Sequence, residues 1–247
     1  MIPLKSEKDL AMLRKSGAIL AKIMKRLEGF IKAGITTAEI DTLAEKLITE
    51  ENVVPAFKGY KGFPASICTS VNEEIVHGIP GARILKEGDI ISLDLGINYQ
   101  GYFSDVAITL GLGRINPKMK KLIEVTKRAL AEGIKQARPE NHLSDISYSI
   151  QNYVESNGFS VVRQFVGHGI GVDLHEEPEI PNFGRPHQGP VLKSGMVFAV
   201  EPMVNMGIWE SVILDNGWTA VTKDGLPSAH FEHTVAITDQ GPEILTN

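Results

Sequence analysis

Carboxylates recur in this sequence beside apolar runs that are typical of buried strands. Asp94 lies inside the run 92–95, and Asp105, Glu201 and Glu232 stand next to further runs of this kind. Burying an unpaired carboxylate is unfavourable, so such a group needs a raised pKa, a basic partner or a cation. No Lys or Arg stands at a matching position of the expected strands that carry Asp94 and Asp105. We therefore predict a divalent metal ion there.

A glycine-rich segment, residues 167–178, carries His168 and His175. Neutral imidazole is the commonest nitrogen ligand for transition metals. The glycines would let the backbone come close to whatever the two histidines face. Taken alone, the segment favours the simpler interpretation, a glycine-rich loop around a structural histidine. The β-branched run before it, residues 161–166, is expected to be a buried strand.

The two aspartates are expected to lie on one hairpin. Residues 90–97 and 102–110 have the pattern of two strands joined around residues 98–101. A turn centred between residues 99 and 100 would place Asp94 directly opposite Asp105, on one face of the sheet. Tyr-Gln is not a favoured two-residue turn, so a bulge or a longer loop could offset the pair.

Caps and apolar periodicity predict the elements that position these groups. Ser6 is expected to cap a helix that ends near Gly29, and the capping-box pattern at 36–39 opens a second helix. Asn116 and Pro117 begin a third helix. The other expected elements are a helix at 144–157, a loop at 182–190, and strands at 66–71, 196–204, near 219–222, and 231–238.

The order helix, helix, strand, strand occurs twice, in halves that cover approximately 1–112 and 113–247. Residues 86–94 match residues 193–201 in their Lys, their Gly and their terminal carboxylate. Two such halves facing each other would bring equivalent carboxylates together. Four carboxylates and one imidazole form a complete ligand set for two divalent cations.

Several polar residues also have simpler interpretations. Glu201, which precedes a proline, could end a strand at the surface, and Glu232 could pair with a nearby Lys. His77 lies in the loop 72–80, where a structural role is the simpler interpretation. The turn-rich loop 55–64 carries three aromatic residues that either line a pocket or cover a core edge. The histidines expected to be structural or exposed are His142, His187, His230 and His233.

Composition limits the class of protein. With 247 residues, 43% of them hydrophobic, the chain can bury a sizeable core as one large domain or two small ones. A net charge of −5 without a basic block argues against nucleic acid or a membrane surface as a partner. The single cysteine, Cys68, excludes an intramolecular disulfide, and no apolar run reaches membrane-spanning length. With no leader-like N-terminus, a cytoplasmic location is expected.

Over essentially its whole length the chain resembles the type I methionine aminopeptidases. The resemblance is most specific in residues 69–73, 77–78, 167–171, 175–178, 201–205 and 231–234. It implies an α+β fold, the pita-bread fold, in which two pseudo-symmetric helix-helix-strand-strand halves surround a central curved antiparallel sheet. Residues 1–247 are then expected to form a single catalytic domain.

The resemblance also implies a set of site residues. The implied metal ligands are Asp94, Asp105, His168, Glu201 and Glu232, which are the four carboxylates and the imidazole described above. The residues implied to contact substrate are His77 and His175, and those implied to line the methionine pocket are Tyr60, Phe63, Cys68 and Trp218. The chain departs from some relatives at Phe57, where they carry Cys, so the edge of the pocket is expected to differ. The sequence at 104–106 is also found in the related proline-specific peptidases.

The implied activity is removal of the N-terminal methionine from nascent proteins and peptides, preferentially when the second residue is small. Two divalent cations (Co, Mn or Fe) would activate water, Glu201 would accept and return the proton, and His77 and His175 would stabilise the oxyanion. The expected partners are peptide and nascent-chain N-termini; a transient ribosome contact is left open, and a monomer is expected. Two alternatives are a proline-directed metallopeptidase of the same fold, which usually carries a further N-terminal domain, and a non-enzymatic peptide- or partner-binding member, which would be expected to have lost ligands.

Overall fold

The computed structural model describes residues 2–247, and its helices begin where the caps predict. The α-helices are α1 (Glu7–Glu28), α2 (Thr37–Glu50), α3 (Pro117–Gln136) and α4 (Leu143–Ser156), with a short 3₁₀ helix, η1, at Tyr60–Gly62. Ser6 and Thr36 each form a capping box, and the Asn116 side chain accepts the N–H of Lys118. None of the helices within residues 2–247 combines the length and the apolarity of a membrane span.

The strands form one large sheet and two small ones, and every pair is antiparallel. The large sheet has the order β1-β4-β5-β14-β9-β7-β8, with β2 also paired to β4 and β15 to β14. The small sheets have the orders β13-β10-β6 and β11-β12-β3. The strand bounds are β1 Val54–Pro55, β2 Cys68–Val71, β3 Glu74–Val76, β4 Ile90–Tyr99, β5 Tyr102–Gly111, β6 Ser160–Val161, β7 Gly167–Gly169, β8 Glu176–Ile180, β9 Val197–Val200, β10 Met203–Asn205, β11 Ser211–Ile213, β12 Ala220–Thr222, β13 Ser228–His230, β14 Glu232–Thr238 and β15 Gly241–Ile244.

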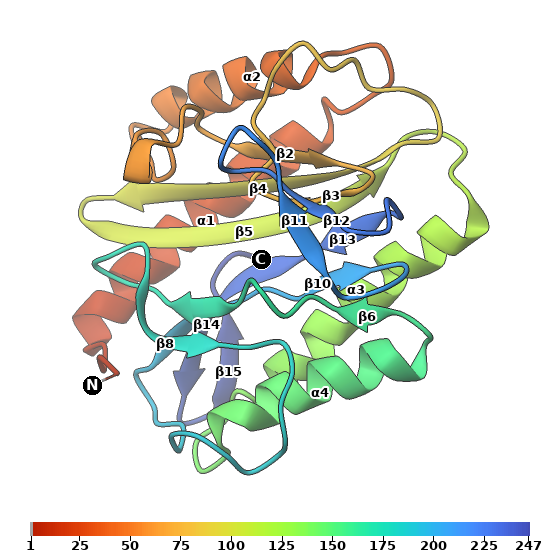
Figure 1. Cartoon of the computed structure of the whole chain (residues 1–247). Coiled ribbons are helices and arrows are strands. Elements are labelled where there is room, and N and C mark those ends of the chain that lie inside the picture. The colour runs from red at the N-terminus through yellow and green to blue at the C-terminus, as the bar shows by residue number, and fades with distance from the viewer. Residues whose placement is uncertain (1) are drawn as a thin grey trace.

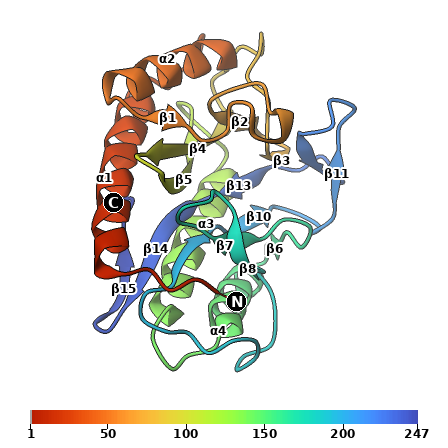
Figure 2. The ribbon, with the colours of Figure 1, turned by 90° about the vertical axis from the view of Figure 1, so that its left-hand side faces the viewer.

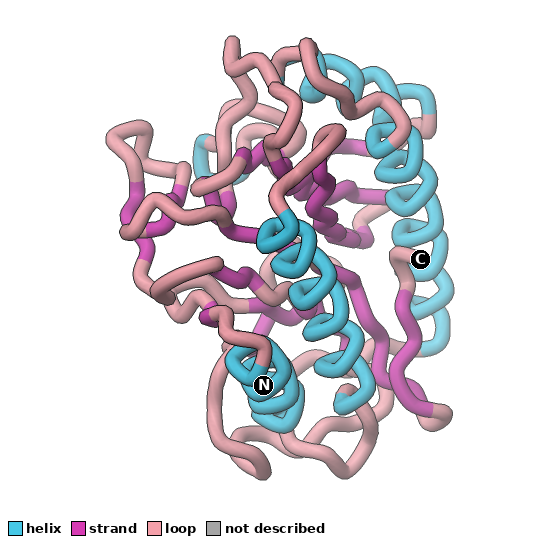
Figure 3. Tube along the Cα trace, turned by 90° about the vertical axis from the view of Figure 1, so that its right-hand side faces the viewer, coloured by secondary structure: helices cyan, strands magenta, loops and turns pink. Residues whose placement is uncertain are grey.

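Two helix pairs cover the large sheet, one over the part that includes β4 and the other over the part that includes β9 and β14. Apolar side chains of α1 and α2 form a buried cluster with β4, which includes Leu20 and Leu93. Those of α3 and α4 form another with β9 and β14, which includes Ile146 and Phe198. Figure 1 shows both helix pairs around the sheet, and Figure 2 shows α1 and β11 at opposite sides of the molecule. Figure 3 shows loops and short strands at its left-hand side, opposite the long helix at its right-hand edge. The predicted α+β class with an antiparallel sheet is confirmed.

Two predicted strands are wrong. Residues 161–166 do not form one buried strand, because only Val161 belongs to β6, and residues 163–164 are exposed in a bend. Residues 196–204 form two strands, β9 and β10, in different sheets. Pro202 lies between them and has no N–H to continue the ladder. The strand expected from residue 66 begins only at Cys68.

The hairpin β4–β5 forms, but the register predicted for it is wrong. Asp94 pairs with Ala107, and Asp105 pairs with Gly96, a shift of two residues from the expected pairing. The turn residues are Gln100 and Gly101, both with positive φ (52° and 89°), as a type I′ turn requires. Side chains alternate with a period of two, so Asp94 and Asp105 still lie on the same face.

Candidate metal centre and pocket

Five side chains of types that can bind a metal lie on or directly after five adjacent strands of the large sheet. Asp94 lies on β4, Asp105 on β5, Glu232 on β14 and His168 on β7, while Glu201 directly follows β9. One donor atom from each of Asp105, His168 and Glu232 lies within 4.8 Å of the others. His168 Nε2 lies 3.6 Å from Oε1 of Glu201. The structure thus places together residues that the sequence separates by up to 138 positions.

The tautomer of His168 is fixed by a neighbouring carbonyl. Its Nδ1 lies 2.9 Å from the carbonyl oxygen of Gly169, which can only accept, so in the neutral imidazole Nδ1 carries the proton and Nε2 the lone pair. A backbone partner of this kind is typical of metal-binding histidines. Gly167 and Gly169 let β7 fit between β8 and β9, because a Cβ there would lie 2.4 Å from the Ala199 carbonyl oxygen and 2.2 Å from that of Glu177, respectively.

The carboxylates repel each other, and two of their oxygens lack a hydrogen-bond partner among residues 2–247. Burial is the largest cause that raises the pKa of Asp94 and of Glu201 to about 7. Burial, reinforced by the neighbouring carboxylates, also raises the pKa of Asp105 and Glu232 well above the ordinary range. Oδ1 of Asp94 and Oε1 of Glu232 are buried and make no hydrogen bond within the described residues. A divalent transition metal could bind these unpaired buried oxygens together with the Nε2 atom of the nearby imidazole. The residues therefore fit such a metal.

A cavity of about 300 Å³ opens beside these ligands and is lined mainly by aromatic and apolar side chains. Phe63 and Trp218 meet edge to face, with ring centroids 5.1 Å apart, and Cys68 is buried beside them. The lining also includes Tyr60, Phe57, His77 and His175, together with all five ligand-type residues. The structure therefore brings every residue of the sequence-predicted site to one cavity.

His175 and His77 contact different residues of the cavity lining. The His175 ring is 4.1 Å from the His168 ring and stacks on Tyr60 at 5.2 Å. The His77 ring meets Phe165 edge to face at 5.5 Å. Burial lowers the pKa of His77 to about 4 and that of His175 to about 3, so both imidazoles are neutral at neutral pH.

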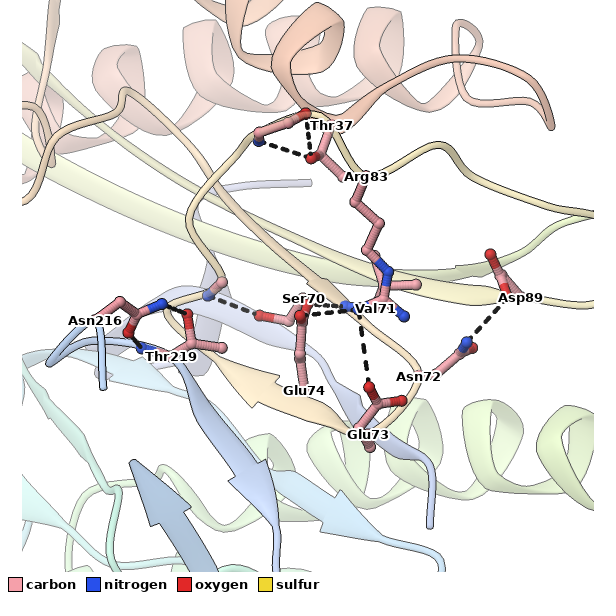
Figure 4. Close-up of polar contacts among 12 residues, drawn as sticks. Thr37, Ser70, Val71, Asn72, Glu73, Glu74, Arg83, Asp89, Asn216 and Thr219 are labelled. Carbon is pink, nitrogen blue, oxygen red and sulfur yellow. Dashed lines mark hydrogen bonds and ion pairs between the residues drawn. The ribbon is translucent and has the colours of Figure 1, made fainter. Parts of the chain in front are cut away.

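Hydrogen bonds to neighbouring loops fix the backbone around His77. Thr219 Oγ1 donates to the carbonyl oxygen of His77 at 3.3 Å, and Asn216 Nδ2 donates to Thr219 Oγ1 at 2.8 Å. The N–H of Gly78 donates to Ser70 Oγ at 3.2 Å. Figure 4 shows these side chains and the neighbouring Asn72–Asp89 contact. The loop that carries His77 is thus held from two sides.

Sequence reasoning missed three residues that contact the candidate ligands. His230 was expected to be structural or exposed, but it is buried, and its Nε2 lies 3.5 Å from Oε2 of Glu201. The signal in the sequence was its position two residues before Glu232, because residues two apart in an extended chain point to the same side. Thr234 Oγ1 accepts the N–H of Asp105 at 2.9 Å and donates to its carbonyl oxygen at 2.8 Å. Asn182 Nδ2 donates to the carbonyl oxygen of Glu201 at 3.0 Å.

The other histidines lie away from the cavity. His233 Nδ1 lies 2.9 Å from Thr246 Oγ1. His142 and His187 lie near Asp145 at the start of α4, with His187 largely exposed.

Comparison with known proteins gives consistent results. The model of the family described as "Metallopeptidase family M24" matches residues 11–239. A curated relative named methionine aminopeptidase, from Clostridium perfringens, is 54% identical over 246 residues, covering 100% of this chain and 99% of that protein. The crystal structure of methionine aminopeptidase from Rickettsia prowazekii aligns with a TM-score of 0.99 at 42% identity, and that from Thermotoga maritima with 0.98 at 45%, each covering 100% of both chains.

Proposed function

The chain belongs to metallopeptidase family M24, and we propose that it is a metal-dependent aminopeptidase that removes the N-terminal methionine from peptides and nascent proteins, preferentially when the second residue is small. One observation carries this proposal: five ligand-type side chains from five adjacent strands border an aromatic-lined cavity. Family membership supports the use of divalent metal, and the names of full-length relatives support methionine as the residue removed.

The proposed metal ligands are Asp94, Asp105, His168, Glu201 and Glu232, and they would hold two divalent cations, Co, Mn or Fe. Asp105 and Glu232 would be shared by both ions, Asp94 would hold one, and His168 with Glu201 the other. When bound, the cations supply Lewis acidity and lower the pKa of water towards neutrality. The unpaired oxygens of Asp94 and Glu232 and the free Nε2 of His168 support this assignment.

Proton transfer is assigned to Glu201. Its carboxylate would accept a proton from the attacking water and return it to the leaving amine. His77 and His175, whose imidazoles are neutral at neutral pH, would each donate an N–H to the carbonyl oxygen as it becomes negative.

The substrate side chain would occupy the aromatic end of the cavity. The residues proposed to line that slot are Tyr60, Phe63, Cys68 and Trp218. Rings and a thiol suit a flexible, polarisable thioether, which gains roughly 0.3 to 1.5 kcal/mol from sulfur–aromatic contact. Phe57 packs against this group of residues, so the edge of the slot would differ from that of relatives with Cys at this position.

The wider setting of the activity is also a proposal. Ligands come from both 1–112 and 113–247, which supports one catalytic domain over residues 1–247. We propose a monomer that acts in the cytoplasm, where nascent N-termini emerge, with transient contact to the ribosome. The alternatives are a proline-directed metallopeptidase and a non-enzymatic binding protein; all five ligand positions being filled argues against the second.

A peptide series tests the proposal. The measured kcat/KM for Met-Ala-Ser should exceed that for Ala-Ala-Ser by more than about a hundredfold, because each unfilled methylene position weakens binding by roughly 1 to 3 kcal/mol. The preference for Met-Ala-Ser over Leu-Ala-Ser should be smaller. Chelation should abolish all turnover. Equal rates on the three peptides would refute the pocket assignment. Preference for Xaa-Pro peptides would identify the proline-directed activity, and no turnover of any peptide by metal-loaded protein would favour a binding function.

A further inference from the structure

A second group of metal-ligand side chains lies at the start of α4, outside the catalytic cavity. It consists of His142, which precedes the helix, Asp145 in its first turn, and His187 in the loop 182–190. One donor atom from each lies within 4.8 Å of the others. None of the three lines the cavity described above. This group is therefore independent of the proposed peptidase site.

Hydrogen bonds already hold the loop against the helix. The N–H of Ser144 donates to the carbonyl oxygen of Gln188 at 3.2 Å, and the N–H of Gln188 donates to Ser144 Oγ at 2.7 Å. The N–H of His187 donates to Asp145 Oδ1 at 2.8 Å. Because these hydrogen bonds place the three side chains beside one another, little ordering of the chain would be needed to bind an ion.

The donor atoms have suitable chemistry and spacing. His187 Nδ1 lies 3.4 Å from Asp145 Oδ1, close to the separation of about 3.4 Å between two ligands of a tetrahedral zinc with bonds of about 2.0 to 2.1 Å. The His187 side chain is 80% exposed, so its ring can adjust, whereas that of Asp145 is 10% exposed. Nδ1 of His142 is buried and makes no hydrogen bond within the described residues. Two imidazoles and one carboxylate favour a borderline transition metal over Mg²⁺ or Ca²⁺.

We propose that His142, Asp145 and His187 bind a zinc ion whose remaining position is taken by water. By binding His187 of the loop 182–190 and Asp145 of α4, the ion would hold the loop against the helix. Asn182 begins this loop and donates to the carbonyl oxygen of Glu201. The ion would therefore stabilise the loop whose first residue hydrogen-bonds to Glu201, and it would lie outside the cavity.

Zinc titration of metal-free protein against a chromophoric chelator tests the site. Wild type should bind one more equivalent of zinc than His187→Ala, and His142→Ala should show the same loss. Gln188→Ala, which alters the adjacent exposed side chain, should bind as wild type does. Zinc should also raise the Tm of wild type above that of His187→Ala measured at the same zinc concentration.

The catalytic ligands are identical in all these variants, so a failed peptidase assignment would leave the comparison valid. A simple His187–Asp145 ion pair would lower the Tm of His187→Ala in chelator and leave its zinc stoichiometry equal to that of wild type. That equality would overturn the proposal.

Discussion

Asp94 and Glu232 both lie opposite Ala107, one on each side of β5. Directly paired residues of antiparallel strands point to the same face, so the Ala107 methyl group lies between two carboxylates. Asp105, two residues earlier on β5, points to this face as well. The smallest chiral side chain thus lies at the centre of this row of carboxylates.

Ala107→Leu is expected to eliminate metal binding, because its larger side chain would fill the space between Asp94 and Glu232. Overpacking of this kind destabilises a fold by roughly 1 to 3 kcal/mol, so the variant should still fold. Metal content and circular dichroism check both statements. Ala107→Ser, which adds only a hydroxyl, serves as the control and should keep its metal. Wild-type metal content in Ala107→Leu would contradict the geometry.

Glu201→Gln is expected to lower kcat by several orders of magnitude, because the amide cannot carry the proton to the leaving amine. His233→Ala should keep most activity, since that histidine adjoins Glu232 in sequence but bonds to Thr246. Steady-state kinetics of metal-loaded proteins make the comparison. Similar losses in both variants would show that the role assigned to Glu201 is wrong.

Thr234→Val should weaken metal binding about 10- to 100-fold, the usual effect of removing a group that orients a ligand. The substitution keeps the shape of the side chain but removes both hydrogen bonds to the Asp105 backbone. Thr126→Val is the matched control, because Thr126 is equally buried but bonds only to the Leu122 carbonyl within α3. Competition with a chelator measures the affinity. An equal change in both variants would indicate a general effect of losing a buried hydroxyl.

The metal-free protein should lose stability as the pH rises from about 6.5 to about 8, above the range in which the opposite titration of His77 and His175 offsets that of the carboxyls. Burial raises the pKa of Asp94 and Glu201 to about 7 in the folded state, above the ordinary value of roughly 4 for unfolded carboxyls. Between these values the unfolded chain releases protons that the folded chain retains, so the free energy of unfolding falls by roughly 1.4 kcal/mol per pH unit for each such proton.

Urea unfolding in chelator across this pH range measures the effect. Saturating Mn²⁺ should remove the loss, because the ion takes the place of the protons. A pH-independent free energy of unfolding in chelator would contradict the burial of these carboxyls.

Sequence patterns predicted the helices well, because caps at Ser6, Thr36 and Asn116 are local signals. The sequence patterns also predicted that Asp94 and Asp105 share one face of the sheet, but not which residues pair with them across the hairpin β4–β5. The turn depends on Gln100 adopting a positive φ, which its side chain does not favour. A slip of two residues preserves the face, so the error in register left both carboxylates on the same side of the sheet.

Other features depended on contacts that no local pattern encodes. The run at 161–166 resembles a strand, yet after Val161 the chain leaves one sheet for another and exposes residues 163–164 in a bend. The position of His230 beside Glu201 follows from the pairing of β10 with β13. Thr234 braces Asp105 across 129 residues of sequence.

The order of strands in the large sheet has a consequence for synthesis and folding. β14 is the central link between β5 and β9, yet it is made after both of them. While the chain is still being translated, the edges of β5 and β9 that later receive β14 have no partner, and unpaired edges favour association with other chains. Pairings so distant in sequence also form slowly. During synthesis the earlier strands should therefore depend on chaperones, or on rapid completion of translation, until β14 closes the sheet.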